Sequence, residues 1–358
     1  MITSFTLARI ARTPDFAFRV IAAANILFFA SFLIVALLAS TKVHAEDAAP
    51  VACVGHNLME TLPAETLAKI NAEAAATKNS EGRLWKIEKA GLKPSYLFGT
   101  MHMTDPRVID LTPEAQTAYD GADTVVIETT EILDEAKASQ ALLAKPDLMM
   151  FTDATTLTSL VDPKDLPAFE KGMAERGMPL AAINKMKPWM IMGIVALPAC
   201  EMARKKSGAP FLDIKLAKDA ESAGKKIEGL ETMLEQVNAI NSLPNEMSVK
   251  NLVETIKLGS KIEDVMETMI VLYTEGKIGS IMPFAKYIVP DSNVNSADYD
   301  DFEEKLINIR NQTMATRADK ILAQGSAFIA VGAMHLVGDK GLVEKFRAAG
   351  YTVTSAGM

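Results

Sequence analysis

Two stretches near opposite ends of the chain share one pattern, and this pattern constrains the fold more than any other feature. Residues 96–102 and 328–335 each start as an apolar run and end in Gly-x-Met-His. Such a run is typical of a buried strand, and glycine lets the backbone turn sharply where the strand ends. Loops at the strand ends of an α/β sheet open into a crevice. The pattern therefore predicts two strands that bring His102 and His335 into one pocket.

The other strand signals indicate an α/β fold. Residues 84–89 largely alternate apolar and charged side chains, as in a half-buried strand, and a turn leads from them into the strand at 95–98. Short apolar runs predict strands at 124–127 and 328–331. A short strand that ends at acidic residues is expected at 226–231, and a final strand at 351–353. Helical periodicity dominates residues from about 145 to 290. We therefore expect a mostly parallel central sheet, built from the N- and C-terminal halves, with a helical insertion in the middle.

The N-terminal segment has the features of a targeting sequence. Arginines precede an uncharged apolar stretch from about Val20 to Ser40, and small residues follow at positions that a signal peptidase reads. Residues 1–45 are expected to be a signal peptide or, if uncleaved, an N-terminal membrane anchor, because the stretch is long enough to span a bilayer. Both alternatives place the rest of the chain in the periplasm or outside the cell, with attachment to the inner membrane in the second.

The length and the net charge of the chain limit its domain organisation and its possible partners. After residues 1–45 we expect a helical extension at 46–82 and a main domain at 83–354 that carries the insertion. The chain has 358 residues, which is enough to bury a sizeable core. Its net charge of −8 argues against nucleic acid as a partner.

The two cysteines are Cys53 and Cys200. An exported chain meets an oxidising compartment, so we predict a disulfide between them. The alternative is half of a metal site, because Cys53 and His56 have Cys-x-x-His spacing. The chain offers no second pair of this kind.

A third candidate ligand follows the apolar run at 125–127. Glu128 stands at the end of this run, where a carboxylate is costly to bury unless it is paired or bound to a cation. Two histidines and one carboxylate suit a catalytic divalent metal such as manganese, cobalt or zinc. The alternatives are that Glu128 caps the following helix and that both histidines are inert, hydrogen-bonded side chains.

The Gly-x-x-His pair, the Val-Ile-Glu strand end and residues 331–342 together resemble the TraB/PrgY/GumN family, which includes the Tiki proteases that act on Wnt ligands in animals. Weaker similarities lie at 84–87, 229–232 and 310–315, and the resemblance covers roughly residues 83 to 354. It implies a metal-dependent hydrolase whose activity needs His102, His335 and Glu128. It implies no particular substrate.

Three further polar residues are candidates for roles in the reaction. Arg310 would stabilise negative charge on a tetrahedral intermediate, or form a salt bridge with Glu228 or Glu231. Asn311 would bind the substrate or orient the arginine. Glu231 would serve as a weak base, orient a histidine, or cap the next helix.

These observations predict an exported metal-dependent hydrolase, and in particular a peptidase acting on a peptide or protein. A divalent cation held by His102, His335 and Glu128 would lower the pKa of water and polarise the scissile carbonyl. The alternative is an exported binding protein without catalytic activity, which uses the same pocket to hold a metal, haem or a peptide.

Overall fold

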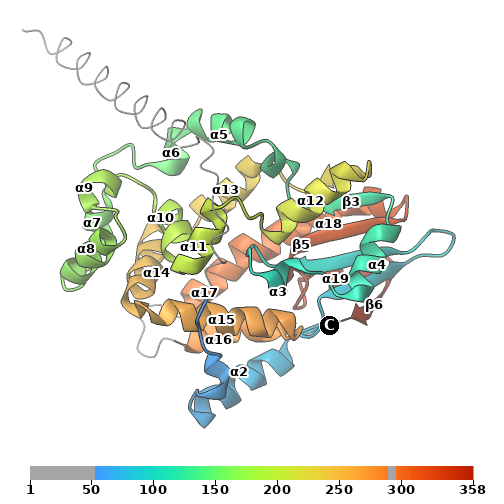
Figure 1. The fold of residues 1–358 in the computed structure, drawn as a ribbon, viewed down its shortest axis with the longest axis horizontal. Helices are drawn as coiled ribbons and strands as arrows, with labels where there is room; N and C mark the ends of the chain where they lie inside the picture. Colours follow the sequence, from blue (N-terminus) through green and yellow to red (C-terminus); the bar gives the residue numbers. More distant parts are fainter. Residues whose placement is uncertain (1–52, 289–295, 358) are drawn as a thin grey trace, which may run out of the picture. The chain divides into compact units, whose positions relative to one another are not determined.

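A six-stranded sheet forms the centre of the structure, a computed structural model that describes residues 53–288 and 296–357 (Figure 1). The segment predicted to be a signal or anchor lies outside these residues. The order across the sheet is β4-β3-β5-β2-β1-β6. The strands are β1 (Leu84–Glu88), β2 (Ser95–Thr100), β3 (Thr124–Ile127), β4 (Lys226–Gly229), β5 (Ala327–Gly332) and β6 (Thr352–Gly357).

The expectation of a mostly parallel sheet is wrong, because the sheet is mixed. The strands β4, β3, β5 and β2 pair in parallel, as the strand–helix alternation predicts. The strand β1 instead pairs antiparallel with both of its neighbours, β2 and β6. A six-residue loop at 89–94 joins β1 to β2 and makes the first pair a hairpin. The last strand then adds to the free side of β1.

The two strands that carry the Gly-x-Met-His motifs are direct neighbours. Strands β2 and β5 run parallel, with Gly99 opposite Val331 and Thr100 opposite Gly332. Their side chains alternate between two buried cores, because successive strand residues point to opposite faces. Phe98 and Phe328 belong to one core, and Leu97 and Ile329 to the other. Both motifs therefore leave the sheet at the same edge.

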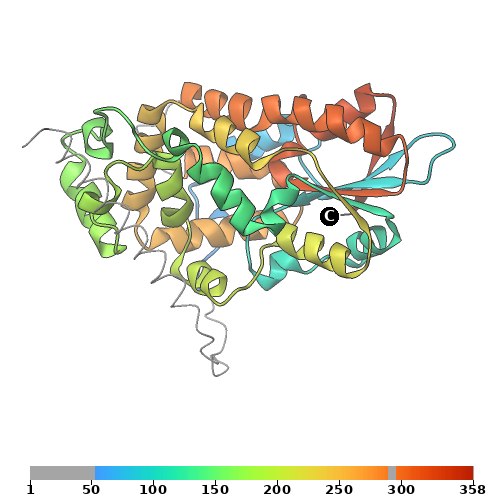
Figure 2. The same ribbon diagram turned by 90° about the horizontal axis from the view of Figure 1, so that it is seen from above.

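Helices cover both faces of the sheet, and Figure 2 shows them on its two sides. The first face is covered by α4 (Pro113–Gly121), α12 (Leu212–Ser222), α15 (Lys261–Thr274) and α16 (Ile281–Tyr287), with α2 (Ala64–Ala76) and α3 (Pro106–Ile109) beside them. The second is covered by α18 (Ile309–Leu322) and α19 (Leu342–Ala348).

Most of the middle of the chain is helical, and part of it has its own apolar core around Phe169, Ile191 and Leu252. Among the described residues, no helix combines the length and the apolar character needed to cross a membrane. The remaining helices are α5 (Glu135–Leu143), α6 (Pro146–Met149), α7 (Leu157–Leu160), α8 (Leu166–Glu175), α9 (Leu180–Ile183), α10 (Pro188–Val195), α11 (Ala199–Lys206), α13 (Met233–Asn241) and α14 (Asn245–Leu258).

The long helix that precedes β5 has an irregularity near its centre. It consists of α17 (Ser296–Glu303), a π-helical turn at Glu304–Asn308, and α18. Wide turns of this kind occur often at functional sites. This one comes directly before Ile309, at the point where the helix reaches the ends of β3 and β5.

The predicted disulfide between Cys53 and Cys200 is confirmed, with a Cα–Cα distance of 5.4 Å. It closes a large loop, because 147 positions separate the cysteines.

Replacing both cysteines by serine should lower the free energy of unfolding by about 2–4 kcal/mol, since the unfolded chain regains conformational freedom. Denaturant unfolding without reductant measures the change. Reductant should weaken the parent protein and leave the double variant unaffected, and equal stability of the two proteins without reductant would contradict this prediction.

Candidate functional site

His102 follows β2, and a carboxylate contacts one of its two ring nitrogens. Its Nδ1 lies 2.8 Å from Oδ2 of Asp213, in the first turn of α12. The other oxygen of Asp213 accepts a hydrogen bond of 2.8 Å from the Thr100 hydroxyl. These contacts fix the imidazole through Nδ1 and leave Nε2 free to face the pocket. No sequence pattern distinguishes Asp213, which is one of several acidic residues on an ordinary amphipathic helix.

His335 is anchored in the same way from the opposite side. It ends the 3₁₀ turn Ala333–His335 that follows β5, and its Nδ1 lies 2.7 Å from Oδ1 of Asn311. The amide nitrogen of Asn311 donates to the backbone carbonyls of His335 and Lys340. Asn311 is fully buried and its polar atoms contact this turn. The geometry therefore makes it a support for His335 and places it out of reach of a substrate.

The pKa values of the two imidazoles are shifted in opposite directions. Burial lowers the pKa of His335 to about 4, so this ring is neutral near pH 7 and its nitrogen can act as a ligand. The carboxylate of Asp213 raises the pKa of His102 above its ordinary value. The His102 side chain is 56% exposed, and solvent weakens that attraction. A carboxylate behind a histidine is a common arrangement around metal ligands, because it fixes the tautomer and the ring orientation.

Glu128 follows β3 and lies between the two motifs. Its Oε1 accepts the backbone N–H of Gly332 at 2.7 Å. Its Oε2 accepts hydrogen bonds from Gln236 at 2.9 Å and from Arg310 at 2.7 Å. Burial raises the pKa of Glu128, but the positive charges that His335, His102 and Arg310 carry at low pH outweigh that effect and lower it to about 2. The buried carboxyl group is therefore ionised.

Arg310 joins two buried carboxylates. Its Nη2 lies 2.6 Å from Glu231 and 2.7 Å from Glu128, and its Nε donates to both oxygens of Glu231. Of the two salt bridges considered from the sequence, the one with Glu231 is present, whereas Glu228 pairs with Lys226. One guanidinium is thus shared by two carboxylates.

The structure brings four of the predicted site residues to the wall of one cavity of about 260 Å³, namely His102, Glu128, Arg310 and His335. Asn311 and Glu231 stand behind them, and the disulfide is not part of the wall. The sequence did not identify Asp213, Gln236 or Gly332 as parts of this arrangement. Gly332 could have been found, because it is the glycine of the second motif.

The chemistry of the donors fits a divalent cation. Oε1 of Glu128 accepts a single hydrogen bond, and it lies 3.8 Å from Nε2 of His335. A carboxylate oxygen and two imidazole nitrogens form a usual ligand set for transition metals. In the described parts of the chain, however, no three histidine, cysteine or acidic side chains already have the spacing needed to hold an ion. Small inward movements of the donors would be required.

Gly332 keeps the space between these donors open. A Cβ at this position would lie 3.2 Å from Oε1 of Glu128 and 4.0 Å from Nε2 of His102. We expect Gly332→Ala to weaken binding of Mn²⁺, Co²⁺ or Zn²⁺ by about 10-fold or more, because the methyl group occupies the space in which the donors converge. Isothermal titration calorimetry measures the change. Gly193→Ala, whose Cβ would meet nothing within 4 Å, is the control. Unchanged affinity in Gly332→Ala would contradict the prediction.

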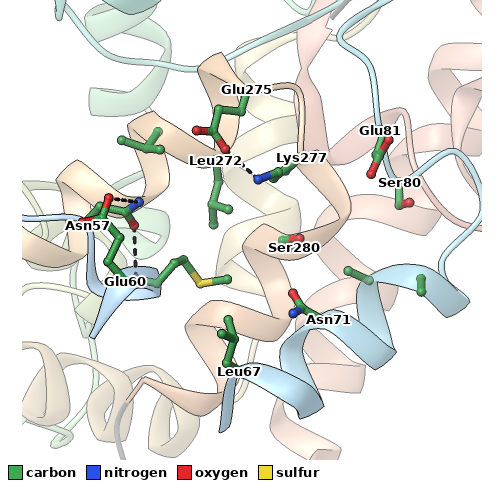
Figure 3. Close-up of a pocket in the computed structure, with 14 residues that line it drawn as sticks. Asn57, Glu60, Leu67, Asn71, Ser80, Glu81, Leu272, Glu275, Lys277 and Ser280 are labelled. Atoms are coloured by element: carbon green, nitrogen blue, oxygen red, sulfur yellow. Dashed lines mark hydrogen bonds and ion pairs between the residues drawn. The ribbon is translucent and has the colours of Figure 1, made fainter. Parts of the chain in front are cut away.

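A larger cavity, of about 540 Å³, lies away from the histidines, between the N-terminal extension and α15 (Figure 3). Its polar groups are already paired in part, since Asn57 bonds Glu60 and Lys277 pairs with Glu275. It contains no histidine, and no residue predicted to take part in a reaction lines it. We therefore place the candidate active site at the smaller cavity.

The chain is similar to several proteins that carry the name metalloprotease. It is 26% identical to Metalloprotease TIKI1 of Xenopus tropicalis over 311 residues, which cover 75% of this chain and 60% of the relative. It is 25% identical to Metalloprotease TIKI2 of Danio rerio, covering 77% and 61%, and 27% identical to Metalloprotease TIKI1 of the same fish, covering 77% and 63%. The chain thus spans a little over three fifths of the length of these relatives. No solved structure matches it.

The model of the TraB/PrgY/gumN family matches residues 83–355, which include β1 to β5, most of β6 and both Gly-x-Met-His motifs. The match covers well over half of the chain, so the resemblance seen in the sequence is confirmed. The protein belongs to the TraB/PrgY/gumN family.

Proposed function

We propose that this protein is an exported metal-dependent peptidase. The observation that carries the proposal is the convergence of three donors from three neighbouring strand ends. Glu128 lies between two imidazoles that are each held through Nδ1, so that both Nε2 atoms remain available at the cavity. The names of the relatives support metal-dependent proteolysis for the family.

In this proposal His102, His335 and Glu128 hold the cation. A divalent ion of manganese, cobalt or zinc would supply Lewis-acid polarisation of the scissile carbonyl and acidification of water. Asp213 and Asn311 orient the two imidazoles from behind. The N–H of Gly332 and the side chain of Gln236 fix the carboxylate plane of Glu128. These residues set the geometry before any substrate arrives.

The remaining polar residues have supporting roles. Arg310 borders the cavity, and we propose that it keeps Glu128 ionised and presents positive charge where a tetrahedral intermediate would carry negative charge. Glu231 is buried, and Arg310 donates to both of its oxygens. We therefore propose that Glu231 positions Arg310, which is a more limited role than that of a base.

The test compares the parent protein with Glu128→Gln on a mixture of unstructured peptides in the presence of Mn²⁺, Co²⁺ or Zn²⁺. The amide keeps the size of the side chain and removes its charge. We expect cleavage to fall by about 10²-fold or more, in the range typical for loss of a catalytic side chain. Mass spectrometry of the products measures the rate and locates the bonds cleaved.

Glu263→Gln is the matched control, because this partly exposed glutamate on α15 lines neither cavity. It should cleave as the parent does. Stable binding of peptide or metal by the parent with no turnover would contradict the peptidase and identify the alternative, an exported binding protein that uses the same donors. Equal cleavage by the parent and Glu128→Gln would show that the reaction does not use this site.

We also propose that the chain functions in the periplasm or outside the cell, through residues 1–45 acting as a signal peptide or as an inner-membrane anchor. The disulfide supports this proposal, because such bonds persist in oxidising compartments. Cell fractionation followed by N-terminal sequencing is the test. An N-terminus near residue 46 in the soluble periplasmic fraction would indicate cleavage, and an intact chain in the membrane fraction would indicate anchoring. Recovery of the intact chain in the cytosol would contradict export.

A further inference from the structure

The cavity that holds the two histidines is lined both by the polar site residues and by a larger number of apolar residues. Its apolar lining comes from five separate parts of the chain, so it is a feature of the tertiary fold. The apolar residues are Met101, Met269, Ile281, Phe302, Leu306, Ile307, Ala333 and Met334. Among the lining residues, the charged or ionisable groups other than a tyrosine are the four site residues named above.

From this arrangement we infer a specificity pocket for one large, unbranched or γ-branched apolar side chain of the substrate, such as methionine or leucine. The inference rests on the proposed peptidase function and concerns the residue beside the bond that is cleaved. The cavity adjoins the donors directly, since Glu128 and Gly332 belong to the same wall as Met269 and Leu306. A side chain bound there would place its own backbone next to the two imidazoles.

Size and chemistry both favour this occupant. A cavity of about 260 Å³ accommodates one large side chain and part of its backbone, and is small for a folded segment or haem. Three of the lining residues are methionines, whose flexible thioethers adapt to side chains of different shape. A charged side chain would lose its hydration against the apolar walls, and the Glu128 and Arg310 charges that line the cavity already pair with each other.

The test uses one series of peptides that differ at a single position, occupied by Met, Leu, Ala, Asp or Lys. We expect kcat/KM for Met and Leu to exceed that for Ala by about 30-fold, because the larger side chains bury several additional methylene groups. We expect the Asp and Lys peptides to react more slowly than Ala. Mass spectrometry of the products establishes whether the varied residue flanks the cleaved bond.

Two variants of Met269, which lines the pocket and is outside the proposed metal site, test the assignment. Met269→Phe should fill the pocket and reduce the advantage of Met over Ala by about 10-fold. Met269→Ala should enlarge it and shift the preference toward a Phe peptide. Both should bind the same amount of metal as the parent. Met178→Phe, a partly buried methionine in the separate helical core, is the matched control and should keep the parent's preference.

A binding measurement separates failure of this inference from failure of the proposed function. Affinities for the same peptides are determined by fluorescence titration with the metal-free full chain. Tighter binding of the Met peptide that is weakened by Met269→Phe, without cleavage of any peptide, would support the pocket and contradict the peptidase. Cleavage with equal rates for Met, Ala and Lys peptides would support the peptidase and overturn the pocket. A preference unaffected by both Met269 variants would also overturn it.

Discussion

Replacing either His102 or His335 by alanine should remove the divalent cation from the protein and abolish peptidase activity. Each imidazole would supply one of three ligands, and a site with two remaining ligands holds an ion weakly. The loss should exceed the roughly 10–100-fold reduction that follows removal of a supporting partner behind a ligand. Both variants should lose the ion to the same extent, because strands β2 and β5 bring the two side chains to one cavity.

The measurement is the metal content of the purified chain after reconstitution with manganese, cobalt and zinc separately, determined by mass spectrometry. We expect about one ion in the parent and none in either variant. His56→Ala is the matched control, since this imidazole is exposed and interacts with Asp264 on the surface. It should bind as much metal as the parent. Retention of the ion in both His102→Ala and His335→Ala would show that the motifs do not form the metal site.

The positions of the candidate ligands could be predicted because they depend on local patterns. An apolar run that ends in glycine and histidine indicates a strand end, and the carboxyl ends of parallel strands meet at one edge of a sheet. Glu128 follows the same rule at the end of β3. The direct pairing of β2 with β5 could not be predicted from such local patterns. It joins residues more than two hundred positions apart, and only packing of the complete sheet determines it.

The errors and omissions also have physical causes. The sheet is mixed because the hairpin turns β1 antiparallel to β2, and β6 then adds antiparallel to the free side of β1. The apolar pattern of a short strand does not encode its direction. Asp213 and Gln236 were missed because each occupies an ordinary helix. An acidic residue in a first helical turn is expected there for its interaction with the helix dipole. Only the tertiary fold brings these side chains to His102 and Glu128.

Arg310 is expected to stabilise the folded protein, because it pairs with two buried carboxylates. We expect Arg310→Met to lower the free energy of unfolding of the metal-free protein by about 3–5 kcal/mol, the usual cost of leaving buried charges without their partner. Glu128 and Glu231 are 8% and 7% exposed, and each accepts a charged hydrogen bond from this guanidinium. Methionine fills a similar volume, so the loss reports the charge. Urea unfolding followed by circular dichroism measures it.

Two comparisons show whether the effect arises from uncompensated buried carboxylates. Arg317→Met removes an arginine that pairs with Glu235 at the surface, where both side chains are about 40% exposed. It should cost no more than about 1 kcal/mol, because solvent screens that pair. Adding Glu231→Gln to Arg310→Met should restore part of the stability, since one buried charge is then removed together with its partner. If Arg310→Met were as stable as the parent, the carboxylates would not depend on the guanidinium. Glu128 could then be free to bind a cation without Arg310, and the arginine would be available for the substrate alone.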